Sequence, residues 1–284
     1  MARHVVVRVP ASSANLGPGF DVLAAALGIH MELEVVETPG VFAVETDLQI
    51  SRDRRNLAVR GFERLLAPDD FTFRIRSEIP LCGGLGTSAA AYVAGLVAAD
   101  HLLGGGTTDL LAAATDLEGH PDNVAAALLG GIVICVDGGT AGIAPPEGLE
   151  LLLATPYAAV RTRQAREALP AAVPIEEAVF NIAHAATLTL GLATGDLDLV
   201  ARGLADRLHQ DRRAHLYPQS LALAAQARAA GALGATISGA GPAVLIWVRS
   251  ARAAEVFDAL VPAVAGWADL RRVAIEAVGA RVVG

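Results

Sequence analysis

The sequence predicts an α+β fold and not a doubly wound parallel sheet. Apolar runs rich in β-branched residues predict strands, some of them as hairpins, and the helices between them do not alternate regularly with strands. The chain has 284 residues, of which 53% are hydrophobic. It therefore holds enough apolar material for one large domain or two modest ones.

In the first half of the chain, each predicted element follows from a local pattern. A β-branched run that ends at a proline predicts a strand over residues 3–10, and alternating apolar and acidic residues predict another over 31–37. A Pro-Gly turn then favours a hairpin between 31–37 and a strand over 41–46. The other elements predicted here are a helix over 56–67, a strand over 71–77, helices over 88–103 and 108–118, a strand over 130–139, a loop over 139–148 and a strand over 149–156.

The second half has a different character. Helices dominate residues 162–231, with turns at prolines and glycines. A strand, a glycine turn and a second strand follow over 235–248, then a helix over 251–264 and a closing stretch of strand character over 271–283. A domain boundary is therefore expected near residues 156–162.

Charge and composition exclude several classes of function. The formal net charge is −8 and the arginine clusters are short and scattered, so small anions fit better as partners than nucleic acid. All 22 Lys and Arg positions are arginine. The lack of lysine excludes a Schiff base through lysine, and it excludes the common phosphate loop that requires one.

The composition also indicates neither secretion nor membrane insertion. Cys82 and Cys135 have no CxxC partner, which favours free thiols in a reducing cytoplasm. We expect no signal peptide, because the N-terminal apolar run is too short. Residues 79–99 are uncharged, but they begin with a Pro- and Gly-rich stretch that cannot be helical, so the helix that follows is expected in the core and not in a membrane.

The segment IPLCGGLGTSAAA, residues 79–91, has the composition of an anion-binding loop. Its three glycines permit left-handed dihedrals, so consecutive backbone N–H groups can converge on one point. The helix that begins near Thr87 and Ser88 aims free N–H groups at the same point, which suits a phosphate without any lysine. A plain glycine-rich connection into a helix capped by Thr or Ser explains these residues equally well on spacing alone.

Two further loops share this glycine-rich character. PASSANLGPGFD, residues 10–21, places Asn15 and Asp21 directly after a buried strand, where a scaffold often holds binding groups. ISGAGPAVL, residues 237–245, places Gly239 between two apolar runs. Taken singly, each is more simply explained as a turn.

Together, in this order and separation, the three loops resemble the three motifs of the GHMP kinase superfamily, and within it the homoserine kinases. The resemblance spans residues 5–282, and Thr87 stands where the family's phosphate loop usually has serine, which keeps a hydroxyl. It implies two domains, an N-terminal ribosomal-protein-S5-like α+β domain over 1–157 and a C-terminal ferredoxin-like α+β domain over 158–284. The segments that carry it are PLCGGLGTSAA, PASSANLGPGFDVLAAAL, LEGHPDNVAAALLGG, AREALP, DRRAHLYP and ATISGAGPAVL.

The resemblance implies ATP and Mg²⁺ at the first loop. Asn56 would lie near the adenine, and Ser88 and Glu118 would hold Mg²⁺, which prefers a few oxygen ligands completed by phosphate and water. Asp116 is an alternative to Glu118, because the spacing to His120 is shorter than in some members. The loop backbone expected around the phosphates comprises Pro80, Leu81, Cys82, Gly83, Gly84, Leu85, Gly86, Thr87, Ser88, Ala89 and Ala90.

It also implies a zwitterionic acceptor, L-homoserine. Asp21 offers a carboxylate to the ammonium group, and Arg166 and Arg213 suit the carboxylate group. Without the motifs, we would expect both arginines in surface ion pairs and His120 in a structural hydrogen bond. The full set implied for this substrate is Asn15, Asp21, His120, Arg166, Arg213 and Gly239.

Direct phosphoryl transfer to the homoserine hydroxyl needs positioning and charge neutralisation more than it needs a base. The resemblance implies Asn123 near the phosphate and Thr162 near the acceptor hydroxyl, with Arg166 and Arg213 as the other catalytic contributors. Asp122 does not obviously supply a base. Homodimers are common among the relatives, and the sequence leaves the oligomeric state open.

Two alternatives stay open at this point. One is a kinase of the same superfamily with another hydroxylated acceptor, such as shikimate or mevalonate, although Asp21, Arg166 and Arg213 favour a zwitterion. The other is a non-catalytic ligand-binding protein, although the intact loop, Ser88 and Glu118 argue against lost turnover. A dinucleotide-binding oxidoreductase is excluded, because the glycines lack the G-x-G-x-x-G spacing within a βαβ unit.

Overall fold

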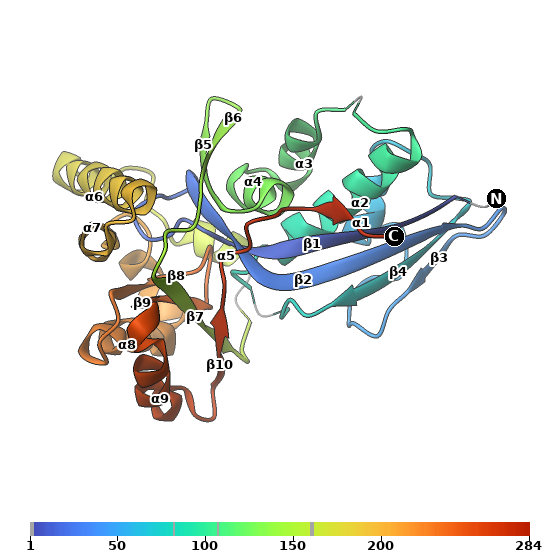
Figure 1. Ribbon diagram of the computed structural model, residues 1–284. Coiled ribbons are helices and arrows are strands. Elements are labelled where there is room, and N and C mark those ends of the chain that lie inside the picture. Colours follow the sequence, from blue (N-terminus) through green and yellow to red (C-terminus); the bar gives the residue numbers. More distant parts are fainter. Residues whose placement is uncertain (1–2, 82, 107, 160–161) are drawn as a thin grey trace.

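The protein is built on two β-sheets with helices packed against them (Figure 1). The structure is a computed structural model that describes residues 3–81, 83–106, 108–159 and 162–284. Within these residues, the first sheet contains β1 (His4–Ala14), β2 (Leu23–Glu37), β3 (Ala43–Glu45), β4 (Phe71–Ser77), β5 (Ile132–Val136), β6 (Gly139–Ile143) and β11 (Arg281–Val282). The second contains β7 (Leu149–Pro156), β8 (Gly234–Ile237), β9 (Val244–Arg249) and β10 (Ala268–Val273). The predicted α+β class is confirmed.

The first sheet has the order β11–β1–β2–β4–β3, with β5 paired to β2 and β6 paired to β5. β1 and β2 are antiparallel, and their register shifts between Pro10 and Ala11. Beyond this irregularity β1 continues to Ala14, so residues 10–14 of the predicted loop are strand. The connection left between the two strands, residues 15–22, carries the polar side chains of the motif.

The predicted hairpin between residues 31–37 and 41–46 is wrong. β3 pairs with β4 in parallel, and β4 lies between β2 and β3. The Pro-Gly turn does reverse the chain, but a strand from further along the sequence takes the place beside β2. A second difference is β6, which forms a hairpin with β5 in the region 139–148 that was predicted as a loop.

Helices cover one face of each sheet. Within the described residues they are α1 (Leu57–Glu63), α2 (Thr87–Leu102), α3 (Leu110–Glu118), α4 (Asp122–Leu129), α5 (Thr162–Glu167), α6 (Ile175–Thr194), α7 (Leu197–Gly203), α8 (Pro218–Ala229), α9 (Ala253–Val264) and the 3₁₀ helices η1 (Asp211–Leu216) and η2 (Ser250–Arg252). α2 and α4 contact β1 and β2, and α1 packs on α2. α8 and α9 pack on the second sheet, and α6 pairs with α7. α4 was not among the predicted helices.

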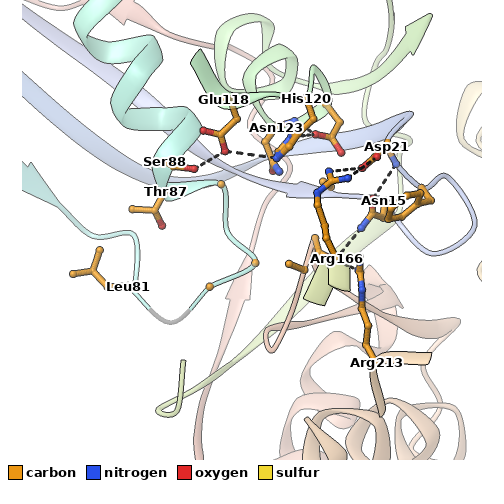
Figure 2. Close-up of a pocket in the computed structure, with 18 residues that line it drawn as sticks. Asn15, Asp21, Leu81, Thr87, Ser88, Glu118, His120, Asn123, Arg166 and Arg213 are labelled. Atoms are coloured by element: carbon orange, nitrogen blue, oxygen red, sulfur yellow. Dashed lines mark hydrogen bonds and ion pairs between the residues drawn. The ribbon is translucent and has the colours of Figure 1, made fainter. Parts of the chain in front are cut away.

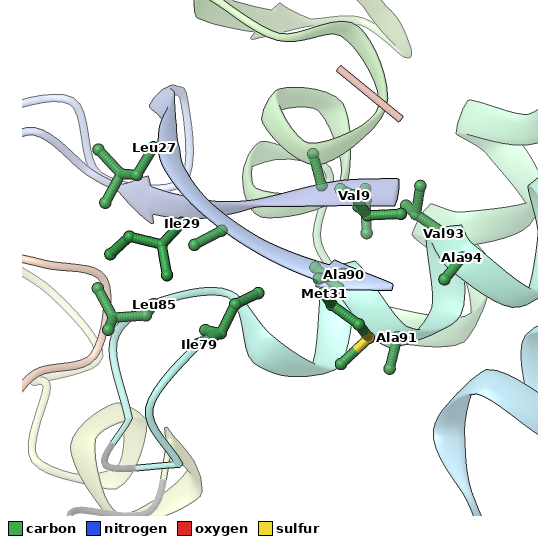
Figure 3. Packing of buried hydrophobic residues seen from close by; sticks show 14 of the residues in the cluster. Val9, Leu27, Ile29, Met31, Ile79, Leu85, Ala90, Ala91, Val93 and Ala94 are labelled. Atoms are coloured by element: carbon green, nitrogen blue, oxygen red, sulfur yellow. The ribbon is translucent and has the colours of Figure 1, made fainter. Parts of the chain in front are cut away.

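The main core fills the space between β1, β2 and α2 (Figure 3). Val9 and Met31 of the strands meet Ala90 and Val93 of the helix, and Leu85 extends the same core from the loop before it. α2 is buried over eleven of its residues on all sides, which confirms the predicted core helix. No described helix is long and apolar enough to cross a membrane.

The two sheets do not divide the chain at a single point. β7 belongs to the second sheet although it precedes residue 157, and β11 returns to the first sheet at the end of the chain. The domains 1–157 and 158–284 therefore stay a prediction. The connections between the two layers bring α5, η1 and the turn between β8 and β9 against the loop between β1 and β2.

Candidate active site

Most of the predicted site residues line one cavity of about 220 Å³ (Figure 2). A second cavity, of about 720 Å³, shares Leu81, Thr87 and Ser88 with the first. The two cavities therefore meet at the start of α2. The predicted residues that line the smaller one are Asn15, Asp21, Leu81, Gly83, Gly84, Gly86, Thr87, Ser88, Glu118, His120, Asn123, Arg166, Arg213 and Gly239.

The glycine loop at this junction takes a backbone path that only glycine follows without strain. Gly83, Gly84 and Gly86 have φ angles of 99°, 83° and 62°, all left-handed. A Cβ on Gly84 would lie 2.4 Å from the carbonyl oxygen of Ser238, and one on Gly86 would lie 2.0 Å from Oγ of Ser12. The loop is thus pressed against β1 and against the β8–β9 turn, and its backbone borders the cavity.

The start of α2 is left without a side-chain cap. Its N-cap residue is Gly86, which has no side chain to accept from the first-turn N–H groups. Thr87 donates from Oγ1 to the carbonyl oxygen of Pro80 at 3.4 Å, and Ser88 donates from Oγ to Glu118. The alternative of a helix capped by Thr or Ser is therefore wrong. The positive end of the helix dipole faces the cavity.

Ser88 and Glu118 place two oxygen atoms next to the loop. Ser88 Oγ lies 2.5 Å from Glu118 Oε1, and burial raises the pKa of Glu118. Among the described residues no group of three or more His, Cys, Asp and Glu side chains could hold a metal ion. The pair nevertheless fits Mg²⁺, whose remaining ligands would be phosphate and water. Asp116 is exposed, lies 4.0 Å from Arg64 and lines a different cavity.

A second polar cluster lies at the start of α4. The Nδ1 atom of His120 donates to Asp122 Oδ1 at 2.9 Å, and this hydrogen bond raises the pKa of His120. The backbone N–H of Asn123 donates to the same oxygen at 2.7 Å. Ser12 donates to Oδ1 of Asn123 at 2.8 Å, so the amide NH₂ of Asn123 is oriented by β1.

The side-chain amide of Asn15 holds the loop between β1 and β2 in an unusual conformation. Asn15 and Asp21 have φ angles of 72° and 56°, which are rare for residues other than glycine. Asn15 donates to the carbonyl oxygen of Gly239 at 2.9 Å and accepts from the backbone N–H of Asp21 at 3.1 Å. Such strain persists only where the surroundings enforce it, which is common at binding sites.

Two guanidinium groups enter the cavity from the C-terminal half. Arg166 of α5 forms a bidentate ion pair with Asp21, at 2.9 and 3.0 Å (Figure 2). Arg213 of η1 is buried, with 2% of its surface exposed, and its Nε donates to the carbonyl oxygen of Ala165 at 2.8 Å. Both guanidinium groups lie over the ring of Phe20, at 5.8 and 5.5 Å from its centroid.

The larger cavity is lined mainly by the segment before α1, with further residues from α1, β4 and α2. The predicted residue Asn56 borders it, but its side chain caps α1. Its Oδ1 accepts from the N–H of Ala58 at 2.9 Å and its Nδ2 donates to the carbonyl oxygen of Ser51 at 2.8 Å. Asn56 therefore shapes this cavity chiefly by fixing the start of α1.

The remaining predicted loop residues have other surroundings. The side chains of Leu85, Ala89 and Ala90 are fully buried in the core, so only their backbone is available to a ligand. Pro80 borders a separate hollow near Tyr157. Cys82 and the side chain of Thr162 lie outside the described residues, so their predicted roles stay predictions.

Sequence reasoning missed two aromatic groups at this site. Phe20 lies inside a recognised motif, yet nothing in the pattern shows that its ring packs under two arginines. His209 is fully buried between the two halves of the chain, with its ring 5.4 Å from that of Phe20. Its position four residues before Arg213 was the only available signal, since the turn that leads into η1 brings the two side chains together.

Known proteins share this fold and a substantial part of this sequence. Residues 55–131 match GHMP kinases N terminal domain and residues 188–265 match GHMP kinases C terminal. The crystal structure of homoserine kinase from Cytophaga hutchinsonii superposes with a TM-score of 0.90 at 27% identity, covering 99% of this chain and 97% of that one. Mevalonate kinase of Methanococcus jannaschii, at a TM-score of 0.74 and 13% identity over 96% of this chain and 98% of that one, shares the fold. The fold and the loop thus define a GHMP kinase, which uses ATP.

Sequence relatives narrow the class further. The chain is 43% identical to homoserine kinase of Moorella thermoacetica over 258 residues, which cover 86% of this chain and 87% of that one. It is 44% identical to homoserine kinase of Gloeobacter violaceus over 256 residues, 84% and 86% of the two chains. The chain belongs to the homoserine kinases of the GHMP kinase family.

Proposed function

We propose that the protein transfers the γ-phosphoryl group of ATP to the side-chain hydroxyl of L-homoserine, giving O-phospho-L-homoserine for threonine biosynthesis. The observation that carries this proposal is the junction of two cavities at the start of α2. The large cavity has the size of a small-molecule site, and the small one is lined by charges of both signs. A phosphoryl group at the junction would touch both.

On the donor side, the nucleoside occupies the larger cavity, and the phosphates lie on the loop of Gly83, Gly84 and Gly86. Backbone N–H groups and the uncapped end of α2 hold them without lysine. Ser88 and Glu118 hold Mg²⁺, which neutralises charge that develops on the phosphate oxygens when it is bound. The exposed position of Asp116 beside Arg64 supports Glu118 as the acidic ligand.

On the acceptor side, the charges match a zwitterionic amino acid. Asp21 receives the ammonium group, and Arg166 and Arg213 receive the carboxylate. Arg213 supports this assignment most strongly, because among the described residues it is buried with no ion-pair partner. Asn15, His120 and Gly239 complete the walls of the same cavity.

The homoserine hydroxyl then attacks the γ-phosphorus directly. An O–P bond forms to the hydroxyl oxygen, the P–O bond to the β-phosphate breaks, and the hydroxyl proton passes to an oxygen of the transferred group. Asn123, oriented by Ser12, contacts the phosphate, and Thr162 is proposed near the hydroxyl. Asp122 is 1% exposed and already accepts from His120 and the backbone N–H of Asn123, which disfavours it as a base.

Steady-state ADP release tests the proposal, with L-homoserine, L-serine, mevalonate and shikimate compared as acceptors. We expect turnover with homoserine to exceed that with the other three, and Arg213→Ala and Glu118→Ala to abolish most of it. Preference for mevalonate or shikimate would overturn the assigned acceptor. ATP binding without ADP release on any acceptor would favour a non-catalytic protein.

The proposal also covers the location, domain organisation and oligomeric state of the enzyme. Its composition favours the cytoplasm, with residues 1–157 as the ATP-binding domain and 158–284 as a domain that contributes to the substrate site. A homodimer is compatible with it. Light scattering of the purified protein measures the oligomeric state directly.

A further inference from the structure

Arg213 is a buried cation surrounded by neutral acceptors. Its Nε donates to the carbonyl oxygen of Ala165 at 2.8 Å, and its Nη1 lies 3.4 Å from the carbonyl oxygen of Gly239 and 3.3 Å from Nδ1 of His209. Burial lowers the pKa of Arg213, although a guanidinium stays charged throughout the physiological range. No carboxylate among the described residues forms an ion pair with Arg213, so the direction of this guanidinium depends on these three acceptors, together with the Phe20 ring and the side chain of Tyr217.

The histidine has only one tautomer that satisfies both of its neighbours. Its Nε2 lies 2.8 Å from the carbonyl oxygen of Gly17, which can only accept, so Nε2 carries the proton. Nδ1 of the neutral ring is then a lone-pair acceptor, and the facing Nη1 of Arg213 can only donate. Burial lowers the pKa of His209, which favours the same neutral form.

The backbone around His209 is fixed by Asp206, whose Oδ2 atom also lies 3.7 Å from Nε2 of the imidazole and favours a proton on that nitrogen. Asp206 has a fully buried side chain and accepts from the backbone N–H groups of Leu208, His209 and Gln210, at 3.0, 3.0 and 2.8 Å. Asn181 of α6 donates to the same carboxylate at 2.8 Å. The backbone position of His209 is therefore fixed as well as its tautomer. A rigid support for another side chain requires both.

We propose that His209 is a positioning residue for Arg213: as a neutral, Nε2-protonated imidazole anchored on Gly17, it orients the Arg213 guanidinium towards the carboxylate of the acceptor substrate. It does not touch the substrate itself, since it does not line the cavity. The inference rests on the proposed function for the identity of that substrate. Loss of the acceptor atom would let the guanidinium turn away, towards Asp21 or the carbonyl groups.

Two conservative variants separate the contacts of His209. In His209→Asn the side-chain oxygen stands near the position of Nδ1 and still accepts from Arg213, whereas in His209→Gln the amide nitrogen stands near Nε2 and still donates to Gly17. We expect His209→Gln to raise the KM for homoserine about tenfold, the effect of losing one hydrogen bond to a charged group, with the KM for ATP unchanged. His209→Asn should retain most of the affinity. His215→Gln, an exposed histidine on η1, is the matched control.

A merely structural role predicts a different result. In that case the Asn and Gln variants would raise the KM for homoserine in proportion to their loss of Tm, which would overturn the inference. In an Arg213→Met background, His209→Gln should produce no further change in the KM for homoserine, because its effect passes through the missing guanidinium. A further tenfold increase there would also overturn it.

The tautomer can be measured without any substrate. The imidazole ¹⁵N spectrum of the ligand-free protein is expected to show His209 neutral and protonated on Nε2 at neutral pH, and the His209→Gln spectrum identifies its signals. An Nδ1-protonated ring, or an imidazolium, would overturn the inference. If the wild type releases no ADP with homoserine, the proposed function fails, while this spectrum still decides the role of His209.

Discussion

Asp21 and Arg166 lie 145 positions apart in the sequence and form a bidentate ion pair across the mouth of the cavity. The Asp21 side chain is 36% exposed and that of Arg166 is 41% exposed. An ion pair that is so open to water contributes little to stability, typically about 0.2–1 kcal/mol. Each partner can therefore exchange the other for the opposite charge of a zwitterionic substrate at small cost. In the proposed function, these two side chains supply the charges that bind the ammonium and carboxylate groups of the amino acid.

Neutralising Asp21 tests this interpretation. Asp21→Asn is expected to raise the KM for homoserine about tenfold or more, because the ammonium group loses a charged partner worth about 1.5–3 kcal/mol, and to leave the KM for ATP unchanged. Its Tm should stay close to that of the wild type. Arg163→Gln serves as the control, because it removes the exposed Arg163–Glu167 ion pair on α5, the helix that carries Arg166. A large loss of Tm in Asp21→Asn with no effect on homoserine KM would contradict the prediction.

Glu118→Gln tests the proposed magnesium ligand. We expect the Mg²⁺ concentration needed for half-maximal turnover to rise at least about tenfold, since the loss of a hydrogen-bonded carboxylate costs a metal site at least that much. Asp116→Asn is the matched control, because it removes a carboxylate of the same helix that faces Arg64. Titration of Mg²⁺ at saturating ATP measures both. If Asp116→Asn raised the required Mg²⁺ concentration more than Glu118→Gln does, the metal ligand would be Asp116.

The pH dependence should report on Glu118. Burial raises its pKa, so its carboxyl group retains a proton to a higher pH than an ordinary glutamate does. Because Mg²⁺ binds only the ionised form, proton and metal compete, and kcat/KM is expected to fall as the pH drops through this raised pKa. Increasing Mg²⁺ must move the midpoint of that fall to lower pH. Profiles of kcat/KM against pH at two Mg²⁺ concentrations measure this shift. A midpoint that does not move would refute Glu118 as the Mg²⁺ ligand.

Substitution of Asp122 tests whether phosphoryl transfer proceeds without a general base. Its carboxylate is buried and bonded to His120 and to the backbone N–H of Asn123, so we expect Asp122→Asn to lower kcat but to retain the acidic limb of the pH–rate profile. The same substitution should lower the pKa of His120, whose main cause of elevation is this hydrogen bond. Disappearance of the limb in Asp122→Asn would identify Asp122 as a general base.

The loop geometry gives a prediction about Gly84. A Cβ there meets the carbonyl oxygen of Ser238 at 2.4 Å as well as a left-handed φ of +83°, whereas Gly40 has a similar φ of +74° and no atom within 4 Å. Gly40→Ala is expected to cost about 1–2 kcal/mol of the free energy of unfolding through its backbone alone. Gly84→Ala should cost more and raise the KM for ATP. Urea unfolding and ATP titration measure the two effects, and equal costs would argue against the close contact.

Local patterns in the sequence were sufficient for several features. Alternating residues over 71–77 and the β-branched run at the N-terminus predicted strands, and both are present. The glycine loop before α2 follows from composition, because a left-handed backbone and an uncapped helix end depend on residues that are neighbours in sequence. Three linked motifs then indicated the superfamily, which the relatives bear out.

Other features depended on residues that are far apart in the chain. The Pro-Gly turn at residues 39–40 predicted a hairpin, but β4 occupies the place beside β2, because strand pairing is decided by the whole sheet and not by the turn. Likewise, no local pattern shows that Asp21 meets Arg166, or that His209 accepts from Arg213 while donating to Gly17. The sequence by itself determined which chemical groups are available and where a glycine-rich loop leads into a helix without a side-chain cap. Only the tertiary structure decided which charges face each other, because those contacts join segments that folding alone brings together.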